Sequence, residues 1–164
     1  GPTTIEGTGE FDNRENCYNV AHTFDALMTF KNGSTINLTS GKNELILSGS
    51  KGKIRVNRGG ITGQIVDQIK SNKQMQEILA DKVQKIYRGP VTPHMVNFFN
   101  CVKSRKLPIS DVFTHHRSVS VCHLANISML LNRKLTWDPN KQDFVGDQEA
   151  SKMISREKRT GFEI

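Results

Sequence analysis

Paired cysteines, long apolar runs and a phosphate-binding glycine loop are all missing from this sequence. Its 164 residues hold three cysteines with no Cys-x-x-Cys pair, so neither a disulfide framework nor a structural zinc site is expected. No apolar stretch approaches the roughly 20 residues that cross a membrane. Few, unpaired cysteines favour a reducing compartment. We therefore expect a cytoplasmic protein with no membrane partner, and the sequence leaves the export of a longer parent open.

The glycines do not form either of the common nucleotide-binding loops. Gly7 and Gly9 lie in an N-terminal stretch that reads as loop, and Gly-Gly-Ile-Thr-Gly at residues 59–63 lacks the Gly-x-Gly-x-x-Gly spacing. The sequence contains no P-loop either. Since these loops hold the phosphates of a nucleotide, we expect no cofactor-binding residue in this chain.

Patterns typical of catalytic groups are also missing. No serine is flanked as in a nucleophile elbow, and no pair of carboxylates stands out as an acid and a base. Cys122 lies deep in an apolar helical pattern, which disfavours a dyad with His115 or His116. We therefore assign no catalytic residue.

Acidic residues are outnumbered by basic ones, 16 against 23, which gives a net charge of +7 and an isoelectric point near 9.5. The basic residues are scattered along the chain rather than gathered in one stripe. A solvated surface explains scattered charge better than a nucleic-acid footprint does. A basic nucleic-acid-binding domain is thus a minor alternative, and we expect no nucleic-acid partner.

One long helical pattern organises the chain. It begins after Ser110 and Asp111, which are helix-capping residue types, and runs without Gly or Pro through Leu131. Asn132 is a residue type that ends helices in the left-handed conformation. The first half is polar, and the second half is apolar around most of its circumference, as in buried helices. We expect a central helix buried in its C-terminal half, with its polar half near solvent or a site.

Strand patterns precede residue 70. Residues 1–17 read mostly as loop, with Ile5 in a short strand, whereas residues 20–40 alternate like a hairpin around Asn32-Gly33. We expect a two-residue turn there, with positive φ at both positions. Residues 44–48 and 53–57 form a second pair of strands, and residues 61–66 favour another short strand.

Helical patterns follow the strands, at residues 71–84, from Thr92-Pro93, and in the central helix. A small hairpin turns at residues 138–140, and Asp147 caps a final helix. This order predicts an α+β fold in two layers, a mostly antiparallel sheet with helices packed on one face. We expect residues 1–164 to form a single domain.

The five histidines do not suggest a metal site. His116 and His123 are seven residues apart, hence on one helix face, but no third ligand has suitable spacing. His123 falls in the apolar half, so we expect it in the core with a hydrogen bond. His115, His116 and Arg117 fall in the first turns, where the helix dipole favours anions. These three are the substrate-facing candidates, with a solvated or capping role as the alternative.

Three stretches resemble the C-terminal domain of Gfo/Idh/MocA-type oxidoreductases, the glucose–fructose oxidoreductase and inositol dehydrogenase family, in its bacterial branch. They are residues 18–33 (YNVAHTFDALMTFKNG), 97–139 (containing SDVFTHHRSVSVCHLANISMLL) and 144–164 (FVGDQEASKMISREKRTGFEI). Complete enzymes of this family have an N-terminal Rossmann domain with a glycine fingerprint, an EKP motif and a later helix with a paired Asp and His. None of these occurs here. The resemblance implies an excised domain or a fragment of a longer polypeptide.

The resemblance also implies a function. The sheet would form one wall of a substrate pocket and join subunits in an NAD(P)-dependent oxidoreductase that acts on a sugar or polyol. The parent's Rossmann domain would hold NAD or NADP, and the isolated chain would be inactive. The alternatives are an NAD-dependent glycosidase of the same family and a non-catalytic homo-oligomeric assembly module.

The implied partners are the missing Rossmann domain and a second copy of the chain. The first hairpin offers apolar residues on both faces, Phe24, Met28 and Phe30 on one and Leu27 and Val20 on the other. Because the helices of a two-layer domain cover only one face, the other would expose apolar surface. We therefore expect a homo-oligomer through the open face of the sheet.

Overall fold

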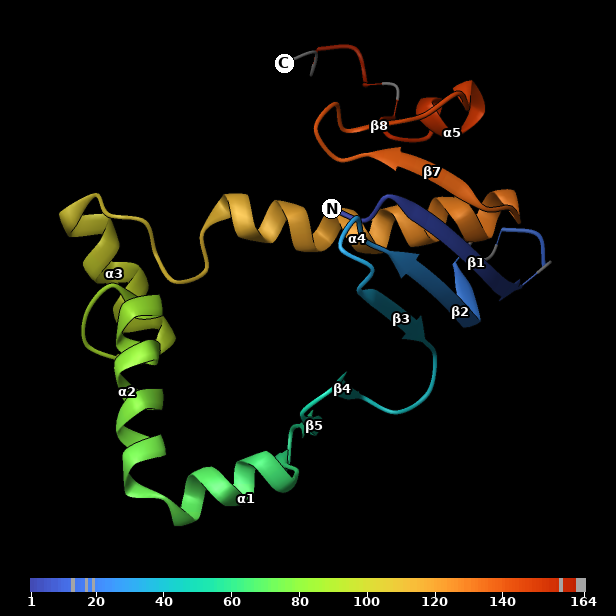
Figure 1. Ribbon diagram of the computed structural model, residues 1–164. Coiled ribbons are helices and arrows are strands. Elements are labelled where there is room, and N and C mark those ends of the chain that lie inside the picture. The colour runs from blue at the N-terminus through green and yellow to red at the C-terminus, as the bar shows by residue number, and fades with distance from the viewer. Residues whose placement is uncertain (13, 17, 19, 157, 162–164) are drawn as a thin grey trace. The chain divides into compact units, whose positions relative to one another are not determined.

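The computed structural model describes residues 1–12, 14–16, 18, 20–156 and 158–161. Its contacts divide the chain into two compact units, residues 1–41 with 113–164, and residues 42–112. Antiparallel strands and helices occur in both units (Figure 1), which confirms the α+β class. That residues 1–164 form a single domain stays a prediction.

The first unit contains a five-stranded sheet. Its strands are β1 (Thr4–Phe11), β2 (Ala21–Thr29), β3 (Thr35–Thr39), β7 (Leu135–Asp138) and β8 (Asp143–Phe144), in the order β3-β2-β1-β7-β8. Every pairing is antiparallel. The sequence predicted only a short strand near Ile5, but β1 spans eight residues and pairs on both sides. The predicted terminal hairpin is confirmed as β7–β8. The strand β1 pairs with β7 on one side and β2 on the other, so it connects this hairpin to the β2–β3 hairpin.

The β2–β3 hairpin is confirmed, but its turn differs from the prediction. Phe30 N donates to Ser34 O and Gly33 N donates to Phe30 O, both at 2.9 Å, so the loop has three residues. Gly33 has a φ of 81°, whereas Asn32 is not among the residues with positive φ. This is the pattern of a type I turn followed by one left-handed residue.

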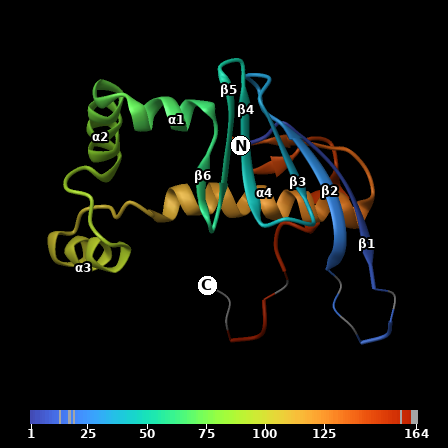
Figure 2. The ribbon, with the colours of Figure 1, turned by 90° about the horizontal axis from the view of Figure 1, so that it is seen from below.

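The helix α4 (Val112–Leu131) packs on one face of this sheet (Figures 1 and 2) and ends, as predicted, at a left-handed Asn132 with a φ of 47°. Its buried residues lie in the C-terminal half, as the sequence predicted. They meet the inward face of the strands in one apolar core, formed by Ile5, Ala26, Met28, Leu124, Ala125, Ile127, Leu135, Trp137, Phe144 and Ala150.

Two small residues let α4 approach β1 closely. A Cβ atom at Gly7 would lie 2.8 Å from Met129 Cγ, so a larger residue would force the Met129 side chain or the helix to shift. The Gly7 N–H donates to the hydroxyl of Ser128, which is fully buried, at 3.0 Å. That hydroxyl in turn donates to Arg133 O at 2.8 Å. The helix is therefore held on the sheet by polar contacts as well as by apolar burial.

The other face of the β1–β2–β3 sheet is mostly polar. The expected apolar residues Leu27 and Val20 do not extend into a patch, because threonines and carboxylates surround Leu27. The strand residues on this face are Thr4, Glu6, Thr8, Glu10, Thr23, Asp25, Leu27, Thr29, Thr35, Asn37 and Thr39.

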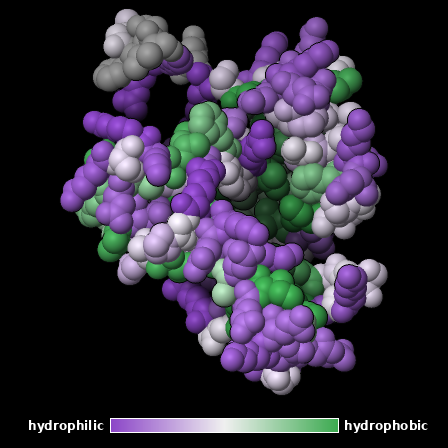
Figure 3. All heavy atoms as spheres, turned by 60° about the vertical axis from the view of Figure 1, so that its left-hand side comes forward, coloured by the Kyte–Doolittle hydropathy of each residue, from purple (hydrophilic) through white to green (hydrophobic). Residues whose placement is uncertain are grey.

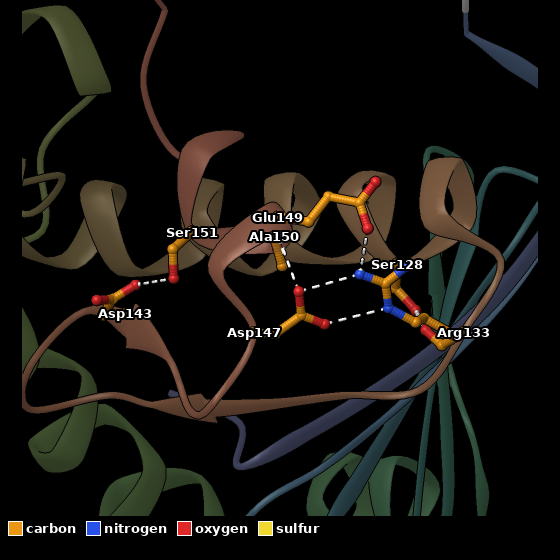
Figure 4. A network of polar contacts seen from close by, with 7 residues as sticks. All are labelled: Ser128, Arg133, Asp143, Asp147, Glu149, Ala150 and Ser151. Carbon is orange, nitrogen blue, oxygen red and sulfur yellow. Dashed lines mark hydrogen bonds and ion pairs between the residues drawn. The ribbon is translucent and has the colours of Figure 1, made fainter.

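An ion-pair network fixes the C-terminal helix α5 (Gln148–Lys152) beside the end of α4 (Figure 4). Asp147 caps α5, as predicted, by accepting from Ala150 N at 3.0 Å. Arg133 donates to both oxygens of Asp147, at 3.1 and 3.0 Å, and to Glu149 at 2.7 Å. The Arg133 hydrogen bond, followed by that from Ala150 N, lowers the pKa of Asp147 below its usual range.

The second unit contains a three-stranded sheet and three helices. The strands β4 (Glu44–Gly49), β5 (Gly52–Asn57) and β6 (Gly60–Thr62) are antiparallel, which confirms the second predicted pair. The helix α2 (Lys73–Tyr87) matches the prediction, and α3 (His94–Ser104) begins after Pro93 rather than after Thr92. The sequence did not predict α1 (Gln64–Ser71), because residues 61–66 read as one strand.

No apolar residue between 42 and 112 is buried, and all of these residues are described. Apolar side chains of α2 and α3 are instead exposed, including Ile86 at 64% and Phe99 at 54%. Figure 3 shows apolar surface among hydrophilic side chains on the face that it displays. The second unit thus lacks a core of its own within this chain.

Candidate functional site

The outer face of α4 borders a pocket with a volume of about 670 Å³. The other walls come from Trp137 of β7, from Gln142 in the loop between β7 and β8, and from the segment after α5. All of these residues belong to the first unit. The volume of the pocket is typical of sites for small molecules.

The helical repeat explains how α4 builds its wall. His116, Ser120, His123 and Ile127 are spaced three or four residues apart, so they share one face of the helix. The adjoining face carries Ala125 and Ser128, which are buried against the sheet. One helix therefore packs into the core on one side and presents donors and acceptors to the pocket on the other.

The floor of the pocket is apolar and firmly packed. Leu124, Ile127 and Trp137 line it, and they are only 3%, 6% and 8% exposed. The Trp137 ring also meets the Phe144 ring edge to face, with the centroids 5.0 Å apart. Since these side chains belong to the core, the shape of the floor is set by the fold itself.

The polar lining consists of two histidines, an arginine, two amides and a hydroxyl. They are His116, Ser120, His123, Asn126, Gln142 and Arg156. The Ser120 hydroxyl already donates to His116 O at 2.7 Å. Within the part of the chain that the structure describes, the other five side chains have no hydrogen bond or ion pair. No aspartate or glutamate is among the described lining residues.

Comparison of the sequence with protein families identifies the family of the chain. The family model for the C-terminal alpha/beta domain of the Gfo/Idh/MocA oxidoreductase family matches residues 12–164. The chain belongs to this family. No curated protein and no solved structure matches it. The match includes all of α4 and the whole pocket, and it confirms the resemblance seen in the sequence.

The Gfo/Idh/MocA domain brings one of the three substrate-facing candidates to the pocket. His116 lines it, whereas His115 and Arg117 are exposed on α4 outside the lining. His123 was expected in the core, and that prediction is wrong, because its side chain is exposed on the pocket side. The seven-residue spacing of His116 and His123 was the correct signal that they share a face.

Sequence reasoning missed Asn126, Gln142 and Arg156. Asn126 has the same helical spacing from His123 that His123 has from Ser120, so the periodicity of α4 could have included it. Gln142 and Arg156 come from a loop and from the C-terminal segment, and no local pattern brings them to α4. Their placement depends on the pairing of β7 with β1.

The structure places two of the three cysteines and tests the described residues for metal-ligand clusters. Cys122 is exposed rather than deep in the core, which corrects the prediction; Cys101 and Cys122 are free thiols, and Cys17 lies outside the described residues. Among described residues, no group of three or more His, Cys, Asp or Glu side chains could hold a metal ion. In the same residues, no helix combines the length and apolar character needed to cross a membrane.

The structure also explains the glycines that resemble nucleotide-binding loops. Gly7 and Gly9 lie inside β1, and Gly63 stands between β6 and α1. The strand β6 pairs antiparallel with β5, whereas dinucleotide-binding glycine loops follow a strand of a parallel βαβ unit. These glycines therefore serve the packing of this domain.

Proposed function

We propose that this chain is the C-terminal domain of an NAD(P)-dependent oxidoreductase that acts on a sugar or polyol. The observation that carries the proposal is the family match over residues 12–164, which includes the pocket on α4. In such an enzyme the nicotinamide cofactor supplies the hydride chemistry, and the protein binds and orients the substrate. The pocket would form one wall of the substrate site.

The lining chemistry suits this role. Imidazole and amide groups both donate and accept hydrogen bonds, as hydroxyl-rich substrates require. His116, His123, Asn126 and Gln142 supply such groups around the apolar floor. We assign no catalytic residue to this chain, because hydride transfer and its proton relay would belong to the cofactor-binding part of the parent. Substrate contact by His115 and Arg117 remains a proposal from their place on α4.

Two partners complete the proposal. One is a Rossmann domain that binds NAD or NADP, and the other is a second copy of the chain joined through the open face of the β1–β2–β3 sheet. The exposed apolar residues of the second unit support dependence on some partner, since such surface is usually covered in soluble proteins. The same observation favours the alternative of a non-catalytic homo-oligomeric assembly module.

The test begins with the reading frame that encodes residue 1. We expect it to continue upstream into a Gly-x-Gly-x-x-Gly fingerprint and an EKP motif. The complete product is then assayed for the formation of reduced nicotinamide with a panel of sugars, polyols, sugar acids and sugar phosphates, with NAD and NADP in separate arms. A parallel arm with chromogenic glycosides tests the glycosidase alternative.

A variant connects the assay to the pocket. We expect His116→Gln to raise the KM for the sugar about tenfold, with a smaller effect on kcat, because it removes binding contacts and no reacting group. His94→Gln is the control, since His94 is exposed in α3 of the other unit. A complete product that turns over none of these substrates, or an equal effect of both variants, would contradict the proposal.

A further inference from the structure

All of the ionisable side chains among the described lining residues of the pocket are basic types. Arg156, His116 and His123 line it, and none of the described lining residues is acidic. Arg156 has no ion-pair partner among the described residues, unlike Arg133, which is held by two carboxylates. A guanidinium that no described carboxylate pairs with, in a pocket that imidazoles also line, is suited to a carboxylate or phosphate.

The pocket is too large and too apolar for an inorganic anion alone. Its volume of about 670 Å³ falls within the range for small-molecule sites. The buried floor of Leu124, Ile127 and Trp137 offers apolar contact to a carbon skeleton. The amides of Asn126 and Gln142 offer neutral hydrogen bonds beside it. The lining therefore fits a charged group attached to an organic body.

We propose that this pocket binds a small organic anion, with the charged group at Arg156 and the body against the apolar floor. The inference rests on the proposed function, because it takes the ligand to be the substrate or product of the parent enzyme. On that basis the substrate class is a sugar acid or a phosphorylated sugar rather than a neutral polyol.

The test uses binding to the chain itself, so it does not depend on turnover. Gluconate and sorbitol have the same six-carbon polyhydroxyl skeleton and differ at one end, where gluconate has a carboxylate. Titration followed by nuclear magnetic resonance should show saturable shifts with gluconate, at residues lining the pocket, and much weaker ones with sorbitol. Glucose 6-phosphate and inorganic phosphate form two further arms, which distinguish a carboxylate from a phosphate and a ligand body from a bare ion.

Arg156→Gln should weaken the binding of the anion about tenfold or more, as expected when a charge-assisted hydrogen bond is lost. Arg159→Gln is the matched control, because Arg159 is also an exposed arginine of the C-terminal segment but lies outside the pocket lining. Both side chains lie at the surface, so neither change should unfold the domain. His123→Gln should weaken binding by a smaller factor.

Each outcome decides for or against the inference. Selective binding of gluconate or glucose 6-phosphate that is sensitive to Arg156 supports it. Equal binding of gluconate and sorbitol, equal losses in the two arginine variants, or binding of inorganic phosphate alone would overturn it. Anion binding by this chain together with an inactive parent would reject the proposed function only, whereas an active parent with a neutral substrate would reject the inference only.

Discussion

His123 and Leu124 are neighbours on α4 but lie in opposite surroundings. The Leu124 side chain is 3% exposed and belongs to the core, whereas that of His123 is exposed beside the pocket. The helical repeat turns adjacent residues by about 100°, so a single step along α4 separates a core position from a pocket-lining one. The two kinds of position should therefore respond differently to truncation.

Truncation of Leu124 should be far more damaging than truncation of His116. We expect Leu124→Ala to lower the free energy of unfolding by about 2–5 kcal/mol, through lost apolar burial and a cavity. His116→Ala should stay within about 0.5 kcal/mol of the wild type, as exposed sites usually do. Denaturant titration followed by the fluorescence of Trp137, the single tryptophan, reports on this core. Similar losses in both variants would show that α4 is rotated from the position described.

For individual residues, the sequence predicts burial in the core better than it predicts the lining of the pocket. Leu124 could be assigned to the core because apolar residues dominate the second half of α4. His123 was misplaced because the same composition suggested burial on all sides, while the position has a pocket beside it. The place of Arg156 could not be predicted, because it depends on a long-range strand pairing.

Among the elements, α5 depends most visibly on one carboxylate. Asp147 caps α5 and pairs with Arg133, which follows α4, so one side chain joins two helices. The structure lowers the pKa of Asp147, first through its hydrogen bond with Arg133. A group whose pKa falls on folding contributes stability above its unfolded pKa, and that contribution is lost as the pH falls through its folded pKa.

Asp147→Asn separates the charge from the cap, because asparagine also caps helices well. We expect the variant to unfold at lower denaturant concentration than the wild type at neutral pH. The difference should shrink as the pH falls below 3.8, the ordinary value for aspartate, towards the lower folded pKa. Glu149→Gln is the control, because the Glu149 side chain is 67% exposed and should contribute little. A difference that is constant with pH would contradict the ion-pair account.

Element types were predictable where one local pattern dominates. The long α4, the β2–β3 hairpin and the Asp147 cap follow from periodicity, a turn sequence and a capping residue. The strand β1 was underestimated because Gly7 and Gly9, which read as loop residues, stand where the helix approaches closely. The helix α1 was missed because Ile61 to Val66 spans the end of one element and the start of another.

At the scale of the whole molecule, the two units differ in how they bury apolar surface. The first has a continuous core between α4 and its sheet, and no apolar residue of the second is buried. Small domains depend on such burial for stability. We therefore expect the second unit to be the part of the chain that gains most from a partner.

Self-association through the open sheet face is tested best at Leu27. Lysine substitutions at Phe24 and Met28 would not test this interface. Met28 is fully buried in the core, so its replacement would destabilise the domain itself. We expect light scattering across a concentration series to show a dimer that Leu27→Lys weakens. Ile46→Lys is the matched control, since Ile46 is 42% exposed in the other sheet and Leu27 is 45% exposed. A chain that stays monomeric, or a dimer sensitive only to Ile46→Lys, would rule out this face.

We propose that this domain contributes a wall of the substrate site but no cofactor site. Isothermal titration of NAD and of NADP, each at millimolar concentration, into the chain of residues 1–164 tests it most directly. We expect no saturable binding of either nucleotide, because the sequence contains no phosphate-binding glycine loop and the described glycines lie within β1 or beside the antiparallel strand β6. Saturable binding of either nucleotide that pyrophosphate displaces would contradict the account.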